Sequence, residues 1–165
     1  MKKTSIFKTL VDLLYVLHFC GLIGIFFILP SGIVNINQAN LNVEDWNVWE
    51  WSIVVLNLIA YLIFLRGLFF LRKMAKFLLS KKYFSNQVIT NLKHSGYYFV
   101  FTAIMTCCIQ ILIFMKKLYL GRLEFIFDAN MFIILFLFTI GLFFIIQSHT
   151  LLMAKHFKEE HELTI

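Results

Sequence analysis

The chain has 165 residues, of which 61% are hydrophobic, 18% aromatic and only 15% charged. Soluble domains are about 45–50% apolar and about 25% charged, and one of this size still exposes roughly 30% of the surface of its unfolded chain to water, so the composition excludes a soluble globular protein. Seven Gly and one Pro also exclude a Pro/Gly-rich disordered or collagen-like chain. We therefore expect an integral membrane protein.

Four continuous apolar runs predict four membrane-spanning helices, because each is close to the roughly 20 residues that cross a hydrocarbon core of about 30 Å. The predicted spans are residues 10–29, 51–71, 96–115 and 131–153. The runs are continuously apolar instead of alternating, and four strands cannot close a barrel, which favours helices. The predicted fold class is all-α: a polytopic membrane protein whose four transmembrane helices form one up-down bundle over residues 1–165.

The first predicted span is expected to be a retained helix and not a cleaved signal peptide. Lys2, Lys3 and Lys8 precede it as they would precede a signal. Its apolar run, however, exceeds the roughly 7–15 residues of a signal's apolar region, and no small-x-small cleavage site follows it. Gly21 and Gly24 are three residues apart, and we expect them to permit close packing inside the bundle.

Residues 72–95, between spans two and three, are expected to extend both helices as a hairpin. Helix two should continue to about Leu79, because apolar side chains recur at helical spacing with basic ones on the opposite face. The apolar positions are Leu71, Met74, Ala75, Leu78 and Leu79, and the basic ones Arg72, Lys73 and Lys76. Ser85 is the expected N-cap of helix three, and the apolar stripe resumes at Val88 and Leu92. The alternative is that this segment lies flat on anionic lipid.

The tail, residues 154–165, is expected to continue helix four past Lys155, and its charge changes sign along its length. Beyond Lys155 and Lys158 come three acids, Glu159, Glu160 and Glu162. We expect these acids to come within reach of the basic hairpin, in pairs that contribute little each if they are exposed. The apolar Leu163 and Ile165 are expected to dock onto the same molecule or onto a partner.

The distribution of basic residues predicts the orientation. Twelve of the fifteen Lys and Arg residues lie at the amino end, from residue 66 to 95, or at the carboxyl end, whereas the loop between spans three and four has three. The loop before span two has three acids and no basic residue. Because basic flanks remain in the cytoplasm, both termini and the hairpin are expected to be cytoplasmic, in a multi-pass protein of the cell (inner) membrane.

Polar side chains inside apolar spans are functional candidates by default. The candidate intramembrane polar network consists of Asp12, Arg66, Gln110, Gln147 and His149. We expect Asp12 to pair with Arg66 near the cytoplasmic side, where snorkelling relieves the cost of burying a charge, and the glutamines to hydrogen-bond between helices. The alternative is a path for protons or ions.

No catalytic, cofactor-binding or metal-binding residue is expected. The sequence has no P-loop, nucleophile elbow or dinucleotide-binding turn. Its five His show no H-E-x-x-H spacing, and its three Cys show neither a metal-site nor a disulfide spacing. We therefore expect a non-enzymatic protein without a cofactor.

The end of the chain, Glu160-His161-Glu162-Leu163-Thr164-Ile165, resembles the E-x-(D/E)-L-T-I ending of a bacterial family of small four-span membrane proteins of unknown function. Phe84-Ser85-Asn86 is similar to that family's Phe and capping residue between spans two and three, although His161 stands where the family more often has Gln or Asn. Members are often encoded beside a small helix-turn-helix regulator. The resemblance implies a membrane partner that senses for or restrains such a regulator, and it supplies no catalytic residues.

Two functional hypotheses follow. In the first, the cytoplasmic hairpin and tail dock a regulatory partner, with no direct binding of nucleic acid. The candidate docking residues are Lys73, Lys76, Phe84, Glu159, Glu160, Leu163 and Ile165. In the second, the chain is a small transporter or channel subunit in which Asp12, Arg66 and Gln110 line a path within a homo-oligomer, because four helices rarely enclose a pore alone.

Overall fold

The structure, a computed structural model, describes residues 2–28, 47–80, 84–119 and 129–163. Its helices are α1 (Lys2–Ile28), α2 (Val48–Leu79), α3 (Asn86–Tyr119) and α4 (Ala129–Leu163). Each overlaps one predicted span and contains a stretch long and apolar enough to cross a membrane. The predicted all-α fold with four transmembrane helices is confirmed, and the chain is a multi-pass membrane protein.

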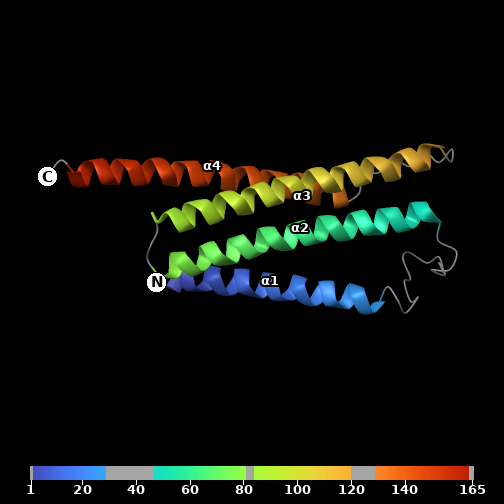
Figure 1. Ribbon diagram of the computed structural model, residues 1–165, viewed down its shortest axis with the longest axis horizontal. Coiled ribbons are helices and arrows are strands. Elements are labelled where there is room, and N and C mark those ends of the chain that lie inside the picture. Colours follow the sequence, from blue (N-terminus) through green and yellow to red (C-terminus); the bar gives the residue numbers. More distant parts are fainter. Residues whose placement is uncertain (1, 29–46, 81–83, 120–128, 164–165) are drawn as a thin grey trace.

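The helices run in alternate directions, so the start of α1, the end of α2, the start of α3 and the end of α4 lie at one end of the molecule (Figure 1). We call this the hairpin end. Among the described residues, backbone contacts join consecutive helices only: α1 to α2, α2 to α3, and α3 to α4. The α2–α3 pair is therefore central, and α1 and α4 lie at opposite edges of the view in Figure 1.

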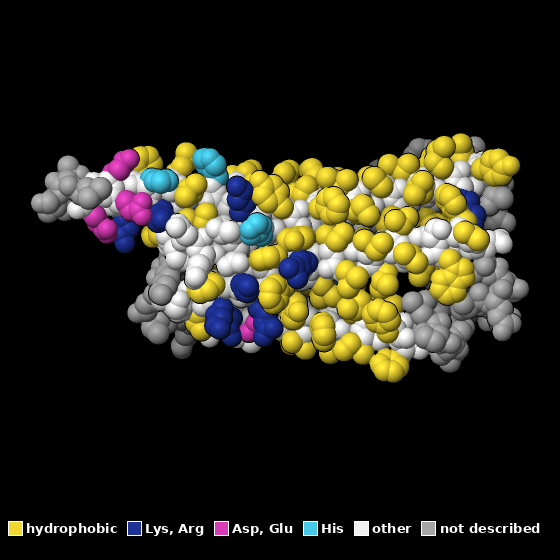
Figure 2. Space-filling view, viewed as in Figure 1, with side chains coloured by type: hydrophobic (Ala, Val, Ile, Leu, Met, Phe, Trp, Pro, Cys, Tyr) yellow, Lys and Arg dark blue, Asp and Glu magenta, His cyan; other side chains and the backbone are white. Residues whose placement is uncertain are grey.

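Apolar side chains cover much of the outer surface. Figure 2 shows them over the middle of the molecule and the end away from the hairpin, whereas charged side chains gather mostly at the hairpin end. On α1, Val11 is the one buried side chain among those the structure describes. Because monomeric soluble proteins rarely expose apolar patches larger than a few hundred Å², lipid is the solvent that suits this surface.

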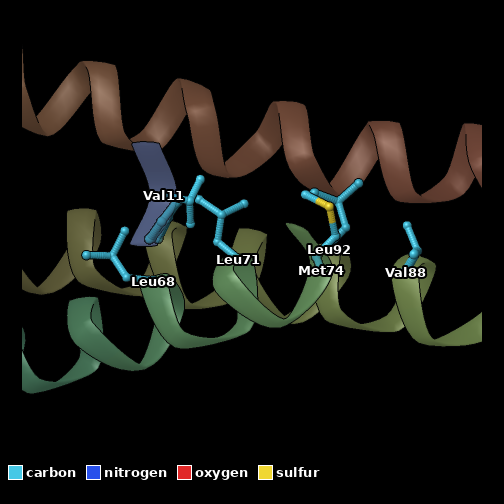
Figure 3. Close-up of a cluster of buried hydrophobic side chains, with 7 residues drawn as sticks. Val11, Leu68, Leu71, Met74, Val88 and Leu92 are labelled. Atoms are coloured by element: carbon cyan, nitrogen blue, oxygen red, sulfur yellow. The ribbon is translucent and has the colours of Figure 1, made fainter. Parts of the chain in front are cut away.

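The buried core lies toward the hairpin end. Its main cluster consists of Val11, Leu68, Leu71, Met74, Val88, Leu92 and Phe99 (Figure 3). Met74, Val88 and Leu92 lie outside the predicted spans, so the extended ends of α2 and α3 are part of the core. The apolar stripe predicted for the hairpin is thus confirmed at these positions, whereas Leu79, at the end of α2, is 45% exposed.

The start of α3 is capped as predicted. The Ser85 hydroxyl oxygen accepts a hydrogen bond from the backbone N–H of Val88 at 3.3 Å, and the Ser85 carbonyl accepts from the N–H groups of Val88 and Ile89. A side-chain oxygen in this position satisfies a donor that the first helical turn leaves without a partner. Together with the shared core, this cap makes α2 and α3 a packed hairpin instead of two segments lying flat.

Glycines allow α3 and α4 to approach closely where they cross. A Cβ atom on Gly96 would lie 2.7 Å from the carbonyl oxygen of Gly141, and one on Gly141 would lie 2.8 Å from the backbone nitrogen of Val100. Small residues at helix crossings are the usual means by which membrane helices gain van der Waals contact. The Gly96–Gly141 contact therefore sets the distance between α3 and α4.

The two glycines of α1 differ from each other. A Cβ on Gly21 would lie 3.1 Å from the Tyr61 hydroxyl of α2, in line with the close packing expected there. A Cβ on Gly24 would meet no atom within 4 Å among the described residues. The expectation for Gly24 is therefore wrong, because the position of its Cβ faces open space among the described residues.

We predict that Gly141→Ala lowers the free energy of unfolding in detergent by about 1–3 kcal/mol, the usual cost of adding a methyl group to a packed site. Gly24→Ala is the matched control and should be neutral or slightly stabilising, since alanine is the better helix former. Thermal unfolding of the purified variants measures both changes. Equal stability of the two variants would contradict the close crossing.

Candidate functional site

Charged side chains of α1 and α2 meet around Asp12 at the hairpin end. Lys8, one turn earlier on α1, donates to Asp12 Oδ2 at 2.9 Å, and the Nε of Arg72 on α2 donates to Oδ1 at 2.8 Å. The Asp12 side chain is 26% exposed and that of Arg72 is 46% exposed, so the group lies at the surface. One carboxylate thus holds a cation from each of the two helices.

Two aromatic rings support the basic side chains next to Asp12. The guanidinium carbon of Arg72 lies 5.2 Å from the centre of the Tyr15 ring, and Lys73 Nζ lies 5.0 Å from the centre of the Phe69 ring. The two rings are themselves 6.3 Å apart. Because the face of an aromatic ring attracts a cation within about 6 Å, the rings and Asp12 together restrict where Arg72 and Lys73 can lie.

Most of these residues line a hollow of about 330 Å³ between α1 and α2, which we call the basic hollow. Its lining consists of Lys8, Asp12, Phe69, Arg72, Lys73 and Lys76. The volume is at the lower end of the roughly 300–1,000 Å³ of small-molecule sites. Four cationic side chains face a single carboxylate, so the hollow is electropositive and suits an anion.

The predicted pairing of Asp12 with Arg66 is wrong, because the register of α1 against α2 places Arg72 beside Asp12. The Tyr15–Phe69 contact follows the same antiparallel register. Arg66 lies six residues from Arg72, about 9 Å further along the helix. It is exposed, and its guanidinium lies 5.8 Å from the centre of the Phe70 ring.

The structure does not bring the candidate polar network together. Gln110 on α3 and Gln147 on α4 are partly buried, and His149 is exposed. In the described parts of the chain, no hydrogen bond or ion pair joins any two of the five network residues. The basic hollow includes Asp12 but neither Arg66 nor Gln110.

Two hydrogen bonds between helices come from polar groups outside the candidate network. The Tyr61 hydroxyl of α2 donates to the His18 carbonyl oxygen of α1 at 2.8 Å, and the buried Ser95 hydroxyl of α3 donates to the Gly67 carbonyl oxygen of α2 at 3.0 Å. Both bonds use a backbone carbonyl as acceptor. Sequence patterns give little indication of such contacts, because any residue can supply that carbonyl.

The described part of the tail is helical, and two of its acids pair with lysines of the same helix. Lys155 Nζ donates to Asn86 Oδ1 at 2.8 Å, and this bond joins α4 to the start of α3. Glu159 lies 3.2 Å from Lys155, and Glu162 lies 3.5 Å from Lys158. Because α4 stays helical to Leu163, each acid meets the lysine four residues before it. Among the described residues, Glu159 and Glu162 do not form the expected pairs with the basic hairpin.

The candidate docking residues lie in two separate places. Lys73 and Lys76 line the basic hollow beside α1. Glu159 and Glu160 are exposed on the end of α4, and Phe84, which is 40% exposed, precedes α3. Two members of the set fall outside the side chains that the structure describes: Leu163 and Ile165. The docking role of the whole set stays a prediction.

The structure shows two ion pairs between helices that the sequence did not predict. One is Arg72 with Asp12, and the other is Lys116 of α3 with Glu50 of α2, at the end away from the hairpin. The spacing of four residues between Lys8 and Asp12 is a local signal that could have identified one cation of the cluster. The interhelical partners depend on helix register, which side-chain packing sets.

Comparison of the chain with protein-family models, with curated proteins and with solved structures finds no match.

We predict that Asp12 and Arg72 are energetically coupled and that Asp12 and Arg66 are not. In a double-mutant cycle with Asp12→Asn, the variant Arg72→Gln should show a coupling energy of about 1 kcal/mol, the upper end for exposed pairs. Arg66→Gln is the matched control and should be additive with Asp12→Asn. Unfolding in detergent measures both cycles, and coupling to Arg66 in place of Arg72 would contradict the register described above.

Proposed function

We propose that this chain is a non-enzymatic membrane protein that docks a regulatory partner at its hairpin end, chiefly through the end of α4. The observation that carries the proposal is that α4 continues as a helix to Leu163, past the Lys155–Asn86 contact with α3. Figure 1 shows this end of α4 extending beyond the end of α2 and the start of α3. Residues 156–163 add about 12 Å of helix, which is enough surface for a partner to bind.

The exposed chemistry of this helix end suits a protein partner. Phe157 is 69% exposed, and Glu159 and Glu160 are also exposed. Since aromatic anchors supply much of the binding energy at protein interfaces, while complementary charge directs association, a basic surface with an apolar pocket is the expected counterpart. The resemblance of the last residues to a family encoded beside helix-turn-helix regulators favours such a regulator as the partner.

The proposed orientation places the hairpin end in the cytoplasm, where a regulator would be found. Its support is the distribution of Lys and Arg along the chain. Twelve of the fifteen lie near the start of α1, near the end of α4, or between residues 66 and 95, around the α2–α3 connection. The transporter alternative receives no corresponding support from the described residues, because the basic hollow that Asp12 lines contains neither Arg66 nor Gln110.

We predict that Lys158→Cys is protected from a membrane-impermeant maleimide in intact cells and reacts after permeabilisation. Tyr119→Cys, at the opposite end and 92% exposed, should react in both conditions. Both substitutions belong in a background in which Cys20, Cys107 and Cys108 are replaced by Ser. The reverse labelling pattern would overturn the proposed orientation.

We predict that truncation after Lys158 reduces recovery of the regulator encoded by the adjacent coding sequence by about tenfold or more in a pull-down with purified components. The truncation removes Glu159 and Glu160 together with the candidate docking residues Leu163 and Ile165, and a few residues supply most of the energy of an interface. Glu159→Gln/Glu160→Gln should lower recovery by a smaller factor. Glu44→Gln/Asp45→Gln removes the same charge from the loop before span two and serves as the matched control. Undiminished recovery by the truncated chain would contradict docking through the tail.

A further inference from the structure

The basic hollow lies where the apolar surface of the molecule ends. Figure 2 shows a group of Lys and Arg side chains around an acidic one at the hairpin end, directly beside the hydrophobic band. The hollow is open between α1 and α2, and its lining includes the apolar Phe69 together with four cations. A ligand in it would therefore touch both a charged rim and the lipid-facing surface.

The helix face that carries Asp12 continues as exposed apolar surface deeper along α1. Residues seven, eleven and fourteen positions after Asp12 share its face of the helix; they are Phe19, Ile23 and Phe26, with exposures of 46%, 44% and 57%. On α2, the apolar Leu62 is 45% exposed. An acyl chain could lie against this surface while its headgroup occupies the hollow.

The geometry points to the basic hollow as a binding site for the phosphate-bearing headgroup of an anionic phospholipid. Phosphate is the chemistry that clustered Lys and Arg recognise, and basic pockets between membrane helices are suited to anionic headgroups. A soluble phosphate compound shares that chemistry but has no acyl chain to contact the exposed apolar face of α1. The cationic rim of the hollow and the apolar face of α1 beside it together favour a phospholipid over a soluble phosphate compound.

The contacts within the hollow leave donors for this ligand. Arg72 binds Asp12 through Nε, so its two terminal nitrogens are not used in that bond and can approach phosphate oxygens as a pair. Asp12 holds Lys8 and Arg72 in place on the two helices, which prepares the site before a headgroup arrives. Lys73 and Lys76 add positive charge that Asp12 does not contact in the structure.

The site is separate from the proposed docking of a regulator by the tail. Truncation after Lys158 removes no residue of the basic hollow, and charge removal at Lys73 and Lys76 leaves the end of α4 intact. Failure of one proposal can therefore be told from failure of the other.

The experiment measures binding of phosphatidylglycerol and phosphatidylcholine to the full-length protein in detergent, by native mass spectrometry over a lipid titration. The wild type should bind phosphatidylglycerol with higher affinity than the zwitterionic lipid. Lys73→Gln/Lys76→Gln should weaken phosphatidylglycerol binding by about tenfold, since each basic residue near anionic lipid adds to the attraction. The charge-conserving Lys73→Arg/Lys76→Arg should retain affinity within about twofold, which separates loss of charge from loss of fold.

The matched control is Lys93→Gln/Lys158→Gln, which removes the same charge from α3 and α4 outside the hollow. It should change phosphatidylglycerol affinity by less than about twofold, because exposed charges away from a site act weakly. An equal loss in the control, or no preference for phosphatidylglycerol in the wild type, would overturn the site. Displacement of the lipid by millimolar inorganic phosphate or glycerol 3-phosphate would overturn the choice of a lipid and assign the hollow to a soluble phosphate ligand.

Discussion

The hydrogen bond from the Ser95 hydroxyl to the Gly67 carbonyl oxygen fixes the helix pair on which the other two helices depend. Ser95 is fully buried, and the ring of Phe99 lies 2.7 Å from where a Cβ on Gly67 would be. The absence of a side chain on Gly67 thus lets α3 lie against the backbone of α2. Because α1 has backbone contacts with α2 alone and α4 with α3 alone among the described residues, any shift of this pair would move both outer helices.

The way α1 is held follows from the solvent around it. Apolar burial gives little net attraction between helices that already lie in lipid, so packing and polar contacts must align them. With Val11 as its one buried described side chain, α1 is aligned by the Tyr61–His18 hydrogen bond and by Asp12 with Arg72. The neutral bond lies deeper and the ion pair lies at the hairpin end, where a charge is less costly. The basic hollow lies between α1 and α2, the one helix whose backbone contacts α1 among the described residues.

Local patterns in the sequence were sufficient to predict the fold, and contacts between helices were not. The apolar runs predicted four helices, and Ser85 followed by a resumed apolar stripe predicted where α3 begins, because a cap and its helix are neighbours in sequence. The partner of Asp12 depended on the α1–α2 register, so Arg66 was chosen in place of Arg72. The same limitation applies to glycine: Gly24 and Gly141 look alike in sequence, and only their neighbours in space distinguish open surface from a close crossing.

The arrangement of charge at the hairpin end explains why its two proposed surfaces need not compete. The basic hollow lies on α1 and α2, the acids of the tail lie on α4, and no backbone contact joins α1 to α4 among the described residues. The tail balances much of its own charge through Lys155–Glu159 and Lys158–Glu162, whereas the hollow keeps an excess of cations around Asp12. In the two proposals, long-range attraction to anionic lipid therefore comes from the hollow, and recognition of a partner by the tail rests on shape and on the exposed Phe157 more than on net charge. A protein built in this way can stay anchored to anionic lipid along one edge while the opposite edge remains available to a partner.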